Sequence, residues 1–134
     1  MSGTLVDSNV IIDVATADAE WLDWSAAMLT AAGERGTVFI NPIVYAEVSA
    51  GFDSLEALDD ALPEAFYARA SLPWKAALLA GQAFRQYRLR GGTRTRTLPD
   101  FLIGAHAAIA GMTLLTRDAR RYRTYFPKLK IIAP

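Results

Sequence analysis

The stretch of sequence that decides the fold is TLVDSNV, residues 4–10, in which a short apolar run leads directly into Asp7. A run of this kind, bounded by a polar turn, is typical of a buried strand. Ser8 and Asn9 are both suited to cap the helix that follows. The stretch therefore predicts a strand over residues 4–7 that passes at once into a helix, with an acidic side chain at the junction.

The same alternation of strand and helix continues along the chain. Further short apolar runs predict strands over residues 38–40, 113–116 and 130–132. Apolar residues at helical spacing, with proline or glycine at many segment ends, predict helices between them. These helices are expected over residues 21–33, 41–51, 54–62, 72–90, 99–110 and 118–125. The alternation predicts an α/β protein: a three-layer α/β/α sandwich with a central, mainly parallel sheet, formed by a single domain over residues 1–134.

The composition is that of an ordinary globular domain. Of the 134 residues, 52% are hydrophobic and 21% are charged, which argues against disorder. There is no cysteine, so disulfide scaffolds, thiolate zinc sites and cysteine nucleophiles are excluded. The N-terminus lacks the features of a signal peptide, and the longest apolar stretch, residues 101–115, is short for a membrane span. We therefore expect a cytoplasmic protein that has no membrane partner.

The net charge of zero hides a division between two halves of the chain. Residues 1–64 carry twelve acidic residues and one basic residue. Residues 65–134 carry thirteen basic residues and two acidic ones, Asp100 and Asp118. Two oppositely charged halves can simply attract each other within one fold. Alternatively, the basic half forms a surface for a polyanion, and its two carboxylates have a special task.

Four acidic residues occupy positions where carboxylates can meet. Asp7 ends one predicted strand and Asp118 lies just beyond another, so parallel pairing brings them to the same edge of the sheet. Glu47 lies on the apolar face of its helix, where it needs either a cation or a salt bridge to an arginine. Asp100 opens a helix above a strip of small residues, although a favourable interaction with the helix dipole also explains its position.

If these four carboxylates converge, they require a cation, because their mutual repulsion is otherwise severe. Mg²⁺ and Mn²⁺ prefer carboxylate oxygens and water as ligands. The absence of cysteine and the presence of a single histidine exclude most zinc sites, and that histidine, His106, is expected to lie in the core. The residues alone therefore predict a carboxylate site for one or two hard metal ions.

Four motifs, in this order along the chain, resemble the PIN domains and in particular the VapC toxins of bacterial toxin–antitoxin pairs. They are LVDSNV at residues 5–10, YAEV at 45–48, PDFLIGAHA at 99–107 and LLTRD at 114–118. The resemblance extends from residue 4 to the C-terminus and implies a PIN-like fold. It also implies a Mg²⁺- or Mn²⁺-dependent ribonuclease that hydrolyses phosphodiester bonds of RNA. One small departure is Gly104, where alanine is more usual.

The resemblance also assigns roles to the acidic residues. The residues expected to form the catalytic site are Asp7, Glu47, Asp100 and Asp118. Asp7, Asp100 and Asp118 are the expected metal ligands, while Glu47 either binds the metal through water or acts as a base. All four acidic positions of the family are therefore present.

Neighbouring polar and basic residues complete the expected site. The residues expected to hold carboxylates and waters in position are Ser8, Asn9 and Thr116. Arginine suits RNA because its fork binds two phosphate oxygens. The arginines expected to bind RNA are Arg94, Arg96, Arg117, Arg120 and Arg121. Ordinary solvated surface is the alternative for these arginines, and Arg117, between Thr116 and Asp118, is the favoured candidate.

Partners also follow from the resemblance. It implies a cognate antitoxin whose C-terminal segment lies across the active groove, and it implies a homodimer. Two other functions remain open. One is a non-catalytic module that binds RNA or a partner protein and retains a structural metal. The other is a Mg²⁺-dependent phosphatase with Asp7 as its nucleophile, which is disfavoured because Asn9 replaces the second aspartate of the expected Asp-x-Asp motif.

Overall fold

The computed structural model describes residues 3–93 and 97–134. At its centre lies a five-stranded sheet in which every pair of neighbouring strands is parallel. The strands, in the order in which they lie side by side, are β3 (Tyr67–Arg69), β2 (Val38–Ile40), β1 (Thr4–Val6), β4 (Thr113–Leu115) and β5 (Ile131–Ile132). The first strand along the chain is therefore the middle strand of the sheet, and all of its residues are buried.

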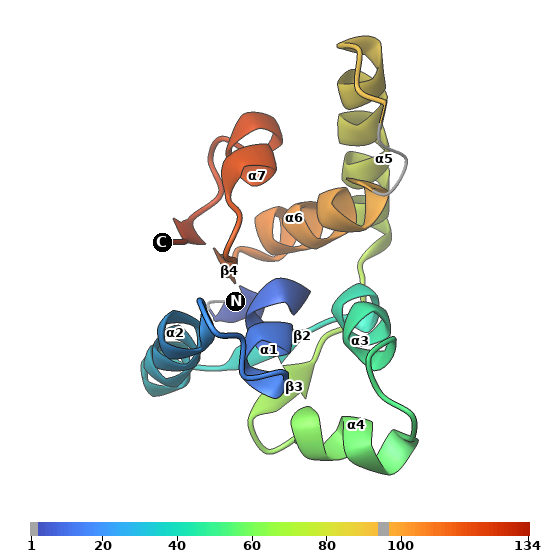
Figure 1. Cartoon of the computed structure of the whole chain (residues 1–134). Coiled ribbons are helices and arrows are strands. Elements are labelled where there is room, and N and C mark those ends of the chain that lie inside the picture. Colours follow the sequence, from blue (N-terminus) through green and yellow to red (C-terminus); the bar gives the residue numbers. More distant parts are fainter. Residues whose placement is uncertain (1–2, 94–96) are drawn as a thin grey trace.

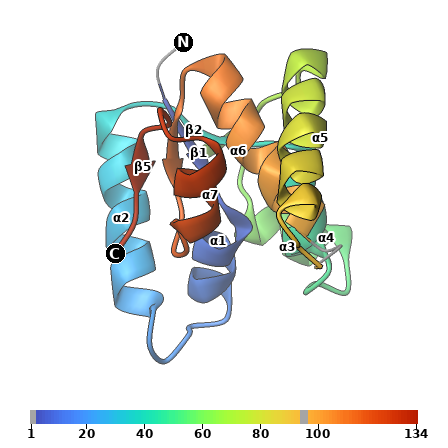
Figure 2. The same cartoon turned by 90° about the horizontal axis from the view of Figure 1, so that it is seen from above.

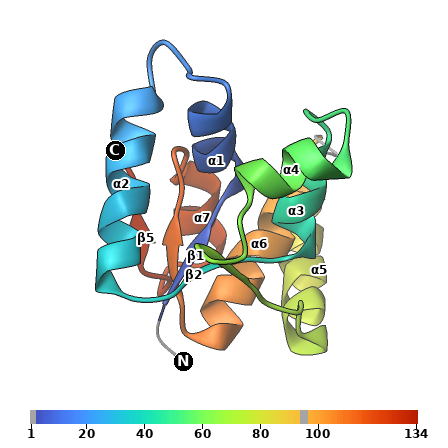
Figure 3. The same cartoon turned by 90° about the horizontal axis from the view of Figure 1, so that it is seen from below.

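Helices surround the sheet (Figure 1). They are α1 (Ser8–Ala15), α2 (Leu22–Arg35), α3 (Pro42–Ser49), α4 (Leu55–Ala61), α5 (Trp74–Leu89), α6 (Leu98–Ala110) and α7 (Arg120–Tyr125). Figures 2 and 3 show α2 on one side of the sheet, and α5 and α6 on the other. This arrangement confirms the expected three-layer sandwich with a parallel sheet. Within the described part of the chain, no helix is long and apolar enough to cross a membrane.

Most of the predicted elements are present, with small shifts at their ends. Helix α6 begins at Leu98, one residue before the predicted start, and keeps Pro99 in its first turn, where the missing N–H costs nothing. Helix α1 begins at Ser8, and Asp7 takes the N-cap position. The assignment of Ser8 or Asn9 to this cap is therefore wrong. The Asp7 side chain makes no capping hydrogen bond, because its carboxylate accepts hydrogen bonds from other elements instead.

Strand β3 is the one strand of this sheet that the sequence analysis does not predict. It lies at the edge of the sheet and passes from buried Tyr67 through half-buried Ala68 to exposed Arg69. Such a segment has neither the apolar run of a central strand nor a clear alternation of apolar and polar residues. Its position is fixed by parallel pairing with β2, which the local sequence does not reveal.

Helix α6 crosses the middle of the molecule and brings Asp100 to the candidate site. A side chain at Gly104 would place its Cβ 2.6 Å from a ring carbon of Phe126, so glycine permits the close packing of this helix. As expected, His106 is a core residue. Its Nδ1 lies 3.0 Å from Asn41 Nδ2, and burial lowers its pKa. Because Asn41 also accepts a hydrogen bond from Val44 N, this pair links α6 to the start of α3.

Candidate active site

The candidate active site lies at the carboxyl edge of the sheet, where parallel α/β proteins place their ligands. Asp7 follows β1, Asp118 follows β4, and Asp100 lies in the first turn of α6. A cavity of about 620 Å³ opens at this edge. Its lining residues are Asp7, Ser8, Asn9, Tyr87, Asp100, Asp118, Arg120, Arg121, Tyr122, Thr124 and Tyr125. Three of the four predicted catalytic carboxylates therefore face one cavity.

Asp7 is held rigidly at the floor of this site. Its side chain is only 5% exposed, and its Oδ2 accepts hydrogen bonds of 2.8 Å from both Thr116 Oγ1 and Tyr122 OH. Burial raises the pKa of the Asp7 carboxyl, although these hydrogen bonds and those from Ser8 lower it in part. The environment therefore disfavours an unpaired negative charge on Asp7 while fixing the orientation of the group.

Glu47 joins the site through Ser8. The Ser8 hydroxyl donates a 2.9 Å hydrogen bond to Glu47 Oε1 and lies 3.5 Å from Asp7 Oδ1. Glu47 is half-buried, and among the described residues no arginine forms a salt bridge with it. Burial raises the pKa of Glu47, and the charge of Asp7 raises it further.

Asp100 completes a group of three carboxylates that repel one another. Burial is the main cause that raises the pKa of Asp100 to about 6, and the charges of Asp7 and Glu47 add to the shift. The guanidinium of Arg121 opposes it, because its Nη1 donates a 2.7 Å hydrogen bond to Asp100 Oδ2. The structure therefore brings Asp7, Glu47 and Asp100 within electrostatic reach of one another, with an arginine beside one of them.

Asp118 lies at the rim of the same cavity and is exposed. Its Oδ1 accepts a 3.4 Å hydrogen bond from the backbone N–H of Arg120, and its own N–H donates to Thr116 Oγ1 at 3.2 Å. The carboxylate thus caps the turn that leads into α7.

The donor set fits a hard cation in its chemistry. Carboxylate oxygens are the ligands that Mg²⁺ and Mn²⁺ prefer, and carboxylates that repel one another gain most from a cation. In the conformation described, residues 3–93 and 97–134 contain no group of three acidic or imidazole side chains assembled closely enough to hold a metal ion. Among the described residues, Arg121 supplies the positive charge that contacts Asp100.

Asn9 and Thr116 connect the site to the loop after β4. Asn9 Nδ2 lies 3.4 Å from Thr116 Oγ1, and Asn9 Oδ1 accepts a 3.1 Å hydrogen bond from the N–H of Arg117. Thr116 is fully buried, and its hydroxyl donates a hydrogen bond to Asp7. Thr116 and Ser8 therefore contact Asp7 directly, while Asn9 connects α1 to the loop that carries Asp118.

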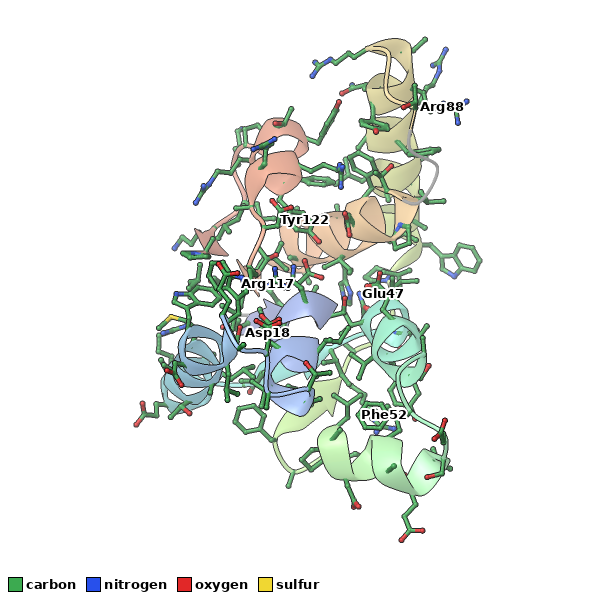
Figure 4. All side chains as sticks on the ribbon, in the orientation of Figure 1. Asp18, Glu47, Phe52, Arg88, Arg117 and Tyr122 are labelled. Carbon is green, nitrogen blue, oxygen red and sulfur yellow. The ribbon has the colours of Figure 1, made fainter. Side chains whose placement is uncertain are left out.

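The arginines predicted to bind RNA have different surroundings. Arg120 and Arg121 line the cavity, and Arg120 is exposed. Arg117 instead turns its guanidinium to Asp13, with Nε 2.8 Å from Oδ2 and Nη2 3.1 Å from Oδ1. Arg94 and Arg96 lie outside the described residues. Figure 4 shows Glu47, Arg117 and Tyr122 around the region where α1 and α3 face α6.

Sequence reasoning missed two residues of this neighbourhood. Tyr122 is 2% exposed and donates to Asp7, yet it lies in a short helix that the sequence marks mainly by its arginines. Asp13 is 2% exposed and binds Arg117 and Ser25. The sequence held a signal for each residue, because side chains four positions apart on a helix are neighbours. Tyr122 is four residues after Asp118, and Asp13 is four residues after Asn9 in an apolar helix.

The family can now be stated. A family model described as the PIN domain matches residues 4–127. The chain belongs to the PIN domain family. PIN domains are generally nucleases, and they typically use divalent metal ions.

Solved structures share the fold of this PIN domain. One is described as VapBC2 from Rickettsia felis bound to a DNA fragment from their promoter, with 19% identity, a TM-score of 0.74 and coverage of 99% of this chain and 98% of that chain. Another is VapBC-1 from nontypeable Haemophilus influenzae, with 17% identity, a TM-score of 0.72 and the same coverage. A toxin–antitoxin complex from Klebsiella pneumoniae has 18% identity and a TM-score of 0.71, and the match covers 97% of this chain and 96% of that chain. No curated protein sequence matches this chain.

Proposed function

We propose that this PIN domain is a metal-dependent ribonuclease that hydrolyses the phosphodiester bonds of RNA. The observation that carries the proposal is the group of three mutually repelling carboxylates, Asp7, Glu47 and Asp100, at the carboxyl edge of the sheet. Asp7 and Asp100 line a cavity that Arg120 and Arg121 also line, so carboxylates lie beside guanidinium groups. A site of this composition suits a polyanion whose backbone is bridged to the protein by a cation.

Each residue has a task in this proposal. Asp7, Asp100 and Asp118 hold Mg²⁺ or Mn²⁺, and Glu47 binds through water or accepts a proton from the attacking water. A metal ion held there would supply an activated water and would neutralise charge that develops on the phosphoryl group. Ser8 fixes Glu47 and lies beside Asp7.

The remaining polar residues either position the carboxylates or neutralise the charge of the RNA phosphates. Thr116, Asn9 and Tyr122 keep Asp7 and the loop after β4 in place, so that the metal-binding oxygen atoms need little rearrangement. Arg120 and Arg121 receive phosphate oxygens of the RNA, and Arg121 exchanges its contact with Asp100 for one with the substrate.

We further propose that the protein is the toxin of a toxin–antitoxin pair and forms a homodimer. Support comes from the similar fold of the VapBC proteins and of the toxin–antitoxin complex from Klebsiella pneumoniae. An arginine of the antitoxin is suited to the carboxylates of the cavity, because one guanidinium can neutralise two of them. Sedimentation, alone and with the protein encoded by the neighbouring gene, tests this part. A protein that sediments as a monomer at micromolar concentration and does not bind the protein encoded by the neighbouring gene would overturn this proposal.

A nuclease assay tests the ribonuclease proposal. The purified protein, freed of any partner, is expected to cleave RNA with Mg²⁺ or Mn²⁺ and to stop when chelator is added. Asp7→Asn and Asp100→Asn should abolish cleavage while circular dichroism shows an intact fold. Asp60→Asn, a change at an exposed aspartate of α4, is the matched control and should cleave like the parent.

Each alternative function has its own outcome in this assay. RNA binding without cleavage under any metal condition would favour a non-catalytic module. Release of phosphate from a phosphomonoester, in the absence of RNA cleavage, would favour the phosphatase. Cleavage that persists in both Asp7→Asn and Asp100→Asn would show that another site, or a contaminant, is responsible.

A further inference from the structure

We propose that Tyr87 and Tyr125 form a subsite for one unstacked base of single-stranded RNA, beside the carboxylates of the cavity. This inference rests on the proposed ribonuclease function and names two residues that would hold a base of its substrate. The two tyrosines come from α5 and from the last turn of α7, and both line the cavity that Asp7 and Asp100 also line.

In the cluster of aromatic rings between α5, α6 and α7, tyrosines and phenylalanines occupy different positions. The cluster consists of Phe84, Tyr87, Phe101, Tyr125 and Phe126. Its two tyrosines line the cavity, whereas its three phenylalanines do not, and Phe101 and Phe126 belong to the buried core. Packing of α7 onto α6 requires large apolar rings but no hydroxyl groups. Both tyrosines are half-buried, so part of each side chain faces the cavity while the rest packs against the core.

Two arginines flank the two tyrosines. The Arg121 guanidinium carbon lies 5.7 Å from the centroid of the Tyr87 ring, and its Nη1 is 2.7 Å from Asp100 Oδ2. The Arg90 guanidinium carbon lies 5.4 Å from the centroid of the Tyr125 ring. Aromatic and guanidinium planes are the surfaces on which single-stranded bases stack. The wall therefore runs from a carboxylate through a cation to two rings and a second cation.

The order of groups along this wall matches one nucleotide. A phosphate next to Arg121 would lie beside Asp100, while the attached base reaches the tyrosine rings. The cavity, of about 620 Å³, is within the usual size range of small-molecule pockets. An uncharged apolar ligand would offer no charged group to the Asp100–Arg121 pair. A base within a duplex is already stacked on both faces and cannot enter, so the subsite takes an unstacked base.

Binding measurements test the subsite without relying on cleavage. In an Asp100→Asn background, fluorescence anisotropy follows a labelled single-stranded oligoribonucleotide and a duplex of the same sequence, with Mg²⁺ present. Tyr125→Leu keeps apolar packing against Phe101, 5.1 Å away between ring centroids in the parent, but removes the ring. It is expected to weaken single-strand binding by roughly five- to a hundred-fold, the effect of losing one base stack. Tyr125→Phe keeps the ring and should bind like its background.

The control is Trp74→Ala. Trp74 is 91% exposed at the start of α5 and does not line the cavity, so its loss should leave binding unchanged. The subsite is wrong if Tyr125→Leu binds the single strand as Tyr125→Phe does, or if the duplex binds as tightly as the single strand. If the parent cleaves RNA and Tyr125→Leu changes neither binding nor KM, the subsite fails while the ribonuclease function stands. If ring-dependent binding occurs but the parent never cleaves, the subsite stands and the ribonuclease function fails.

Discussion

Two arginine–carboxylate pairs, both formed by arginines after β4, have similar contact distances but different environments. Arg117 approaches Asp13 to 2.8 Å, and the Asp13 side chain is 3% exposed. Arg121 approaches Asp100 to 2.7 Å, and the Asp100 side chain is 34% exposed. The first pair is doubly hydrogen-bonded, and Ser25 also donates to Asp13. The second pair rests on one hydrogen bond and faces a cavity.

The difference shows that contact distance alone does not reveal what an ion pair does. The buried Asp13 carboxylate accepts hydrogen bonds from Arg117 and Ser25, so its pairing with Arg117 satisfies a buried charge and ties the β4–α7 loop to α1. Asp100 faces Asp7 and Glu47, so Arg121 only partly offsets their repulsion. We infer that the buried pair is structural, and that the open pair can be exchanged for a metal ion or a phosphate.

The largest expected effect is the loss of the buried pair. Asp13→Ala should lower the free energy of unfolding by about 3 kcal/mol or more, because it leaves the Arg117 charge uncompensated and removes a partner of Ser25. Urea unfolding measures this loss. Asp59→Ala is the matched control: it breaks an exposed pair with Arg69 and should cost less than about 1 kcal/mol. Equal losses in the two variants would remove the distinction between buried and open pairs.

Removal of the charge on Asp100 should have the opposite sign. In chelator, Asp100→Asn is expected to melt at the same temperature as the parent or higher, because the folded state disfavours this charge. Mg²⁺ at one hundred times its dissociation constant should stabilise the parent by about 2.7 kcal/mol, and the variant by much less. Thermal unfolding with and without Mg²⁺ checks both statements. A variant that is less stable in chelator and responds normally to Mg²⁺ would make Asp100 an ordinary helix-start residue.

The third prediction concerns pH. The pKa of Asp100 is about 6 in the folded state, against an ordinary value of 3.8, so the folded state binds this proton more tightly than the unfolded state does. The Asp100 contribution to the free energy of unfolding therefore falls as the pH rises from about 4 to about 6. In chelator, the melting temperature of Asp100→Asn should exceed that of the parent most at about pH 7, and the gap should narrow towards about pH 5. If the difference in melting temperature widens on acidification, the pKa of Asp100 is lowered in the folded state rather than raised, and the prediction is wrong.

The smallest expected effect separates the two arginines. Arg121→Gln should lower the free energy of unfolding in chelator by less than about 1 kcal/mol, because the pair that it breaks is partly exposed. Arg117→Gln should cost more, since it leaves Asp13 buried without its counter-charge. Urea unfolding of the two variants side by side measures the difference. If Arg121→Gln costs as much as Arg117→Gln, the cavity pair is structural as well.

The sequence by itself determined the layout of the fold. Short apolar runs and helical periodicity are local signals, and they predicted the central strands, most of the helices and the parallel sheet. The same local signals placed Asp7 and Asp118 at the carboxyl edge of the sheet and Asp100 at a helix start. Strand β3 escaped because an edge strand that passes from buried Tyr67 to exposed Arg69 carries no comparable pattern.

Only the tertiary structure decided which side chains meet. Tyr122 binds Asp7, and Arg117 binds Asp13, across more than one hundred residues of chain. Nothing local distinguishes Arg117, held by a buried aspartate, from Arg121, which faces the cavity. Sequence periodicity fixes the face of an element on which a residue lies, whereas a hydrogen bond or an ion pair requires two such faces to be packed together. That packing is a property of the whole fold, and so is the choice of partner for each charge.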